Sequence, residues 1–86
     1  MNLDDLLHRY FGTSQLSEAS PPVREAGVDR LRVDLGLETD RKRRFALWSL
    51  LYMLGHAPDL DVAFKEKTDR DAARTFMDLL AASETE

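Results

Sequence analysis

The sequence predicts an all-α fold: a compact bundle of four to five short helices around a central apolar helix at about residues 40–55. No segment alternates apolar and polar residues over the length of a strand, and no hairpin dipeptide separates two apolar runs. Several segments instead repeat apolar residues at helical spacing, between capping residues, glycines and prolines. The run from Phe45 to Leu54 is apolar on nearly every side, with Ser49 as its only polar side chain, so this helix must be enclosed.

The first helix is expected from Leu3 to Phe11, with Asn2 as its N-cap and Gly12 as its stop. Residues 13–20 are rich in hydroxyl side chains and predict a loop, with one helical turn around Leu16. The apolar residues of this first helix form an amphipathic stripe, which comprises Leu3, Leu6, Leu7, Tyr10 and Phe11.

Ser20 followed by Pro21 predicts the start of a second helix, since serine can cap free N–H groups and proline fits the first turn. This helix is expected to run to Leu35, with Gly36 as a left-handed stop. Gly27 costs about 1 kcal/mol relative to alanine in a helix interior, which predicts the close approach of a neighbouring helix. The expected inward stripe comprises Val23, Gly27, Val28, Leu31 and Leu35, and Val33 lies off this stripe.

The third helix is expected to begin after Thr39 or Asp40, to include a basic turn at residues 41–44, and to end at Gly55. Trp48 and Tyr52 lie four residues apart on one side of it. The opposite side carries Leu47, Leu50 and Leu54. Because a thin bundle cannot easily cover both sides, the pattern predicts a partner or a second copy.

Pro58 and the acids after it predict a short fourth helix through Phe64, which adds Leu60, Val62 and Phe64 to the core. Thr68 resembles the first residue of a capping box and opens a last helix to about Ala82. Residues 83–86 form an acidic tail that should fray, so a single domain is expected over residues 1–82. One face of the last helix is expected to hold Ala72, Ala73, Phe76, Met77, Leu79 and Leu80.

The chain has 86 residues, a formal net charge of −4 and a pI near 5.1, which disfavours overall attraction to nucleic acid or anionic lipid. The absence of cysteine excludes disulfides and thiolate chemistry. The amino terminus is acidic where a secretory signal needs basic residues, and the apolar run is short of the roughly 20 residues of a membrane span. We expect a cytoplasmic protein with no membrane contact, and its nine arginines against three lysines favour a bacterial origin.

The basic turn consists of Arg41, Lys42, Arg43 and Arg44, and it is unusual because cations in the first turn of a helix oppose the dipole. One interpretation is a contact with an anion or phosphate; the other is a solvated turn offset by Glu38, Asp40 and Asp34. Helical spacing points the four side chains in four directions, which favours the second. Folding could add Lys65, Lys67, Arg70 and Arg74 to this group, but interleaved acids predict local pairs such as Arg74 with Asp78.

The histidines and nearby acids offer nitrogen and oxygen ligands, but the spacing of His8, His56, Asp59 and Asp61 matches no zinc pattern and no EF-hand loop. The chain also has no cysteine nucleophile, no serine elbow and no glycine-rich phosphate loop. We therefore expect no metal, no cofactor and no catalytic activity.

The sequence thus favours a small helical protein–protein interaction module that self-associates or docks a protein partner. The candidate interface residues are Val33, Trp48 and Tyr52, and the basic turn from Arg41 to Arg44 is expected to supply polar contacts at the rim. The alternative is a small nucleic-acid-binding regulator that uses the same basic turn and whose affinity falls steeply as salt rises.

Overall fold

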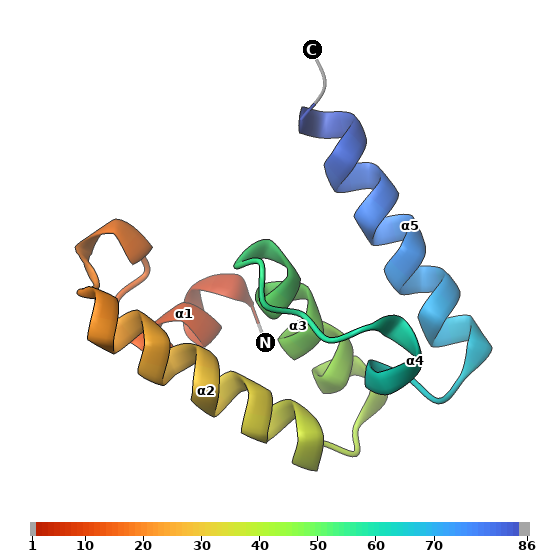
Figure 1. Cartoon of the computed structure of the whole chain (residues 1–86), viewed down its shortest axis with the longest axis horizontal. Helices are drawn as coiled ribbons and strands as arrows, with labels where there is room; N and C mark the ends of the chain where they lie inside the picture. The colour runs from red at the N-terminus through yellow and green to blue at the C-terminus, as the bar shows by residue number, and fades with distance from the viewer. Residues whose placement is uncertain (1, 85–86) are drawn as a thin grey trace.

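The computed structural model describes residues 2–84, whose regular structure is entirely helical (Figure 1). The elements in chain order are α1 (Leu3–Phe11), the 3-10 turn η1 (Leu16–Glu18), α2 (Pro21–Leu37), α3 (Arg41–Met53), α4 (Leu60–Ala63) and α5 (Lys67–Glu84). The predicted all-α bundle is confirmed, and so are the bounds of the first helix and the helical turn at Leu16.

Local caps explain where α1 and α3 begin and end. The side chain of Asn2 accepts a hydrogen bond from the backbone N–H three residues later at 2.8 Å, and Asp40 does the same at 2.9 Å. Asp40 rather than Thr39 is therefore the N-cap of α3. After the two helices, Gly12 and Gly55 adopt left-handed φ angles of 73° and 80°, which a residue with a Cβ adopts only with strain.

Helix α2 does not stop where the sequence predicts. Gly36 is helical rather than left-handed, and the helix continues to Leu37. The N–H of Glu38 closes the last turn by donating to the carbonyl oxygens of Asp34 and Leu35, at 2.9 and 3.4 Å. A left-handed residue is not needed because the carbonyl groups at this end find other donors, one of which is an arginine of α3 described below.

The predicted close approach at Gly27 is confirmed, because α1 packs against α2 at this residue. A Cβ atom on Gly27 would lie 2.7 Å from the carbonyl oxygen of Tyr10 and would overlap the ring of Phe11. The missing side chain lets these two residues reach the core, where they are 5% and 4% exposed.

Helix α3 is enclosed on both sides by its own chain. Helix α2 packs along one side and α5 along another (Figure 1). Beside α5 lies an aromatic cluster whose neighbouring ring centroids are 5.3 to 6.2 Å apart, formed by Phe45, Trp48, Tyr52, Phe64 and Phe76. The prediction that so small a bundle leaves one side of this helix uncovered is wrong, because five large rings fill the space.

In α1, α2 and α4, three residues predicted for the core lie at the surface instead. Val62 in α4 is 75% exposed, Leu3 in α1 is 45% exposed and Val23 in α2 is 43% exposed. Helix α4 is a single turn that turns Leu60 and Ala63 toward the core and leaves Val62 outside, and Ala63 and the following Phe64 are each 2% exposed.

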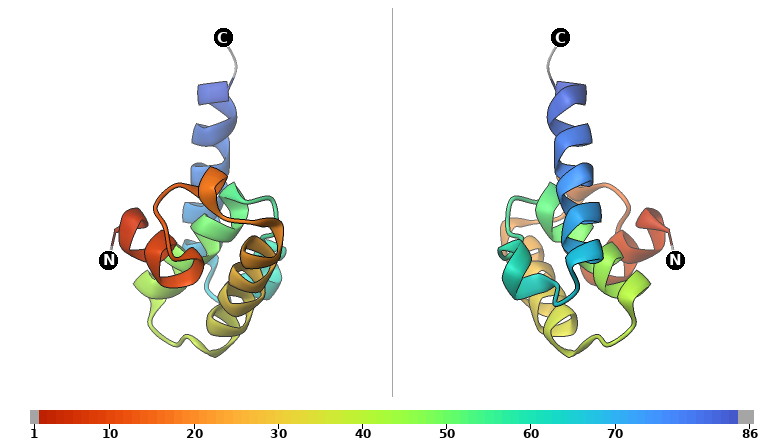
Figure 2. Two further views of the ribbon diagram at one scale, coloured as in Figure 1. Left: turned by 90° about the vertical axis from the view of Figure 1, so that its left-hand side faces the viewer. Right: turned by 90° about the vertical axis from the view of Figure 1, so that its right-hand side faces the viewer.

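Helix α5 starts one residue before the predicted capping threonine and runs to Glu84, past the predicted end near Ala82. Ser83 and Glu84 of the predicted tail are helical, and residues 85 and 86 lie outside the described residues. The C-terminal half of α5 projects away from the body formed by the other helices (Figures 1 and 2). None of the helices between residues 2 and 84 combines the length and apolar character that a bilayer crossing needs.

Candidate functional site

The three arginines of the basic turn at the start of α3 contact different partners within the chain, and Lys42 is exposed. Arg44 reaches the ends of two helices: its Nη1 donates to the carbonyl oxygens of Leu35 at 2.6 Å and Glu38 at 2.8 Å, and its Nη2 donates to that of Ala63. These carbonyl groups lie at the negative ends of α2 and α4, where a cation is favourable. Arg44 therefore acts as a cap for two helices other than its own.

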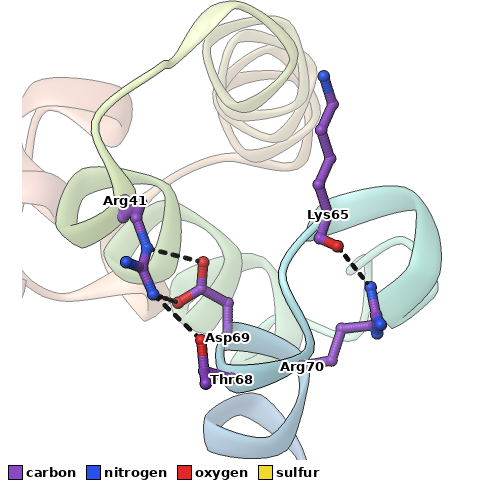
Figure 3. A network of polar contacts seen from close by, with 5 residues as sticks. All are labelled: Arg41, Lys65, Thr68, Asp69 and Arg70. Atoms are coloured by element: carbon purple, nitrogen blue, oxygen red, sulfur yellow. Dashed lines mark hydrogen bonds and ion pairs between the residues drawn. The ribbon is translucent and has the colours of Figure 1, made fainter.

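Arg41 connects the start of α3 to the start of α5 (Figure 3). Its Nε lies 3.1 Å and its Nη2 lies 2.8 Å from the two carboxylate oxygens of Asp69, and Nη2 also donates to the hydroxyl of Thr68 at 3.2 Å. The hydrogen bond from Arg41 holds the pKa of the Asp69 carboxyl below its ordinary value, and the same bond raises the pKa of Arg41. The hydroxyl of Thr68 thus accepts a hydrogen bond from Arg41 instead of capping α5 as predicted.

The three carboxylates expected to offset the basic turn have separate roles. Glu38 forms an ion pair with Arg43 at 3.5 Å. Asp40 caps α3 through its side chain. Asp34 faces α1 instead, where its carboxylate accepts a hydrogen bond from the phenolic hydroxyl of Tyr10. Only the first of the three is therefore paired with a cation of the turn.

Three of the cations around α5 also contact nearby groups. Arg70 donates from Nη1 to the carbonyl oxygen of Lys65 at 2.8 Å, across the turn between α4 and α5 (Figure 3). Arg74 pairs with Asp71 at 3.6 Å and not with Asp78, its predicted partner. The preference agrees with orientation, since an acid that precedes its cation on a helix is the better arrangement: Asp71 lies three residues before Arg74, whereas Asp78 follows it by four.

Some basic residues of the two groups do meet after folding. Arg41, Arg44 and Lys65 line a hollow of about 520 Å³ between the end of α2 and the turn before α5. Three acids line the same hollow, namely Glu38, Glu66 and Asp69. Because carboxylates match the cations in number, this hollow does not offer the one-signed surface that a phosphate backbone requires.

The three candidate interface residues lie in three different environments. Trp48 is 1% exposed within the aromatic cluster, so its ring is already buried by the chain itself. Tyr52 is half-buried and stacks on Trp48 with the ring planes 17° apart. Val33 is 60% exposed on α2. The three residues therefore do not form one exposed patch.

Tyr10 forms a polar contact that sequence reasoning missed. Its ring lies under the guanidinium groups of Arg30 and Arg9, at 5.6 and 5.8 Å from the ring centroid. Burial raises the pKa of Tyr10 to about 12, and the hydrogen bond to Asp34 adds to this increase. The contact joins α1 to α2 at a part-buried position.

The exposed apolar surface of α5 was also not anticipated. Leu79 is predicted to face inward, but it is 65% exposed on the projecting half of the helix. The face that meets the core is centred on Ala73, which is 0% exposed, and continues through Phe76 and Met77. At 100° per residue Leu79 lies well away from this face, and a finer helical projection could have revealed it.

Comparisons of the chain with protein-family models, with curated proteins and with solved structures each find no match.

Proposed function

We propose that this protein is a small helical protein–protein interaction module that self-associates through the C-terminal half of α5. The observation that carries the proposal is the projection of this half from the body, with Leu79 65% exposed at its surface (Figure 2). An amphipathic helix that extends beyond its own domain gains stability by burying apolar surface against another chain.

The charge distribution along α5 favours a second copy as the partner. Residues 67–74 carry three cations and two carboxylates, whereas residues 75–84 carry two carboxylates and no cation. Two such helices in antiparallel orientation place the acidic end of one beside the more basic end of the other, and their dipoles oppose favourably. A parallel arrangement would bring the acidic ends together.

The surface is small, so we infer a reversible dimer rather than a permanent one. A contact made mainly by one helix from each copy buries less than about 1,200 Å² of accessible surface in total, and interfaces of this size are typically transient. Tyr52 lies at the border of this surface, with its ring centroid 6.2 Å from that of Phe76. The nine arginines against three lysines of the chain support a bacterial origin.

Sedimentation analysis over a concentration series tests the proposal. The mass is expected to rise from 9.8 kDa toward twice this value, and Leu79→Glu is expected to weaken the dimer by roughly tenfold or more because it places a charge in the contact. The matched control is Leu37→Glu, since Leu37 is 75% exposed at the end of α2, away from this surface. A strictly monomeric wild-type chain, or equal effects of the two variants, would rule out self-association through α5.

A further inference from the structure

Gly36 occupies a position that its surroundings do not explain. It lies inside α2 with an ordinary helical φ, and a Cβ atom placed on it would meet no atom within 4 Å. Neither a turn nor a close approach therefore requires glycine here, although glycine weakens a helix by about 1 kcal/mol relative to alanine. The missing side chain instead leaves open space beside the helix.

That space belongs to a hollow of about 450 Å³ between the last turns of α2 and the segment that leads into α4. Helix α2 contributes Leu35 and Gly36 to its lining, and the segment that leads into α4, together with α4 itself, contributes Pro58 and Val62. The volume lies in the range of sites that hold small organic ligands. Apolar side chains make up most of the lining, so the hollow suits an apolar body.

The polar side chains of this hollow are all basic or histidine: Arg32, Arg44 and His56. No carboxylate lines it, whereas Glu25 and Asp29 line the adjacent hollow of similar size, and acids also line the hollow beside Lys65. Among the hollows of residues 2–84 described here, this one therefore combines apolar walls with a lining that holds cations and no carboxylate.

Donors remain for a ligand after the internal contacts are counted. A guanidinium has five N–H groups, and Arg44 uses three of them on the carbonyl groups at the ends of α2 and α4. Arg32 contacts Nδ1 of His56 through Nη2 at 3.3 Å and forms a long, exposed ion pair with Asp29 through Nη1 at 4.0 Å, which leaves other N–H groups of the guanidinium unused. Both guanidinium groups can thus bind a further acceptor.

We propose that this hollow binds a small monocarboxylate with a short apolar body. The carboxylate accepts hydrogen bonds from Arg32 and Arg44, which match its geometry and charge. The apolar body occupies the space beside Gly36, where Leu35 and Val62 also line the hollow. This site stands apart from the surface of α5 and does not depend on self-association.

Titrations of the full chain followed by amide chemical shifts test the site, with 3-phenylpropionate as the probe. Saturable shifts are expected around Gly36 and Val62. The alcohol 3-phenylpropanol lacks the charge and acetate lacks the apolar body, so each is expected to bind about tenfold more weakly or worse. Equal binding of the alcohol, or equal binding of acetate, would overturn the proposal, as would the absence of saturable shifts with the probe.

Two variants locate the binding within the hollow. Gly36→Leu fills the space and is expected to weaken the probe about tenfold, while it keeps the fold because leucine is the better helix former. Arg32→Gln removes one of the two guanidinium groups that bind the carboxylate of the probe, and it is also expected to weaken binding about tenfold. Arg44 is left unchanged because it caps two helices. Val33→Ala is the matched control on α2, and unchanged affinity in Gly36→Leu would place the probe elsewhere and end the proposal.

Discussion

Nη1 of Arg44 lies 2.6 Å from the carbonyl oxygen of Leu35, across the short connection between α2 and α3. The same guanidinium reaches Ala63 at the end of α4. One side chain thus holds together the ends of two helices that are nearly thirty residues apart in the chain. A cation that is unfavourable at the start of its own helix becomes favourable at the ends of its neighbours.

Removal of this guanidinium should destabilise the fold. Arg44→Gln is expected to lower the free energy of unfolding by about 3 kcal/mol, because part-buried carbonyl groups lose a charged donor. Urea unfolding monitored by circular dichroism measures the change. Lys42→Gln is the control, since Lys42 is exposed in the same turn, and its effect should stay within about 0.5 kcal/mol. Similar effects of both variants would show that Arg44 is not a structural cap.

Tyr10 should make stability depend on pH in the alkaline range. Its pKa is raised from 10.0 to about 12 in the folded chain, so the folded state holds the phenolic proton more tightly than the unfolded state. The resulting stability is complete below about pH 10 and is lost as the pH rises toward 12. Two pKa units correspond to roughly 2–3 kcal/mol.

Tyr10→Phe isolates this contribution. The variant should lose about 1–2 kcal/mol at neutral pH, because the carboxylate of Asp34 loses its donor. Between pH 9 and pH 12 its stability should fall less than that of the wild-type chain. Urea unfolding at a series of pH values compares the two, and parallel curves would contradict the assigned role of the hydroxyl.

The two glycines inside α2 should respond in opposite ways to alanine. Gly27→Ala is expected to destabilise the chain by about 2–3 kcal/mol, because its Cβ would be forced against Tyr10 and Phe11. Gly36→Ala is expected to stabilise it by about 0.5–1 kcal/mol, because the Cβ meets open space and alanine favours the helix. Thermal unfolding measures both, and a loss of stability in Gly36→Ala would contradict the described environment.

The fold followed closely from local sequence patterns. The caps at Asn2 and Asp40 and the left-handed residue Gly12 are short-range signals, and each marks a helix end correctly. The prediction that α2 stops at Gly36 was wrong, because a glycine after an apolar stretch is a typical helix stop. In this protein an arginine of the next helix, Arg44, binds the carbonyl groups at the end of α2 instead. Local patterns do not contain that information.

The candidate site was less predictable, because its contacts join residues that are distant in sequence. The partner of Arg41 is Asp69, 28 residues later, and the partner of Tyr10 is Asp34, 24 residues later. Nothing in the spacing of charges along the sequence distinguishes Asp69 and Asp34 from the other acids as partners. The exposure of Leu79 depends in turn on how far α5 extends beyond the body, which is a property of the assembled fold.

The burial of Trp48 also gives the chain an optical reporter of its own. It is the only tryptophan, it stacks on Tyr52, and its ring centroid lies 6.1 Å from that of Phe76 in α5. The indole therefore sits at the junction where the projecting helix joins the rest of the protein. Movement of α5 relative to α3 changes the environment of a single fluorophore, so intrinsic emission follows that junction without any added label.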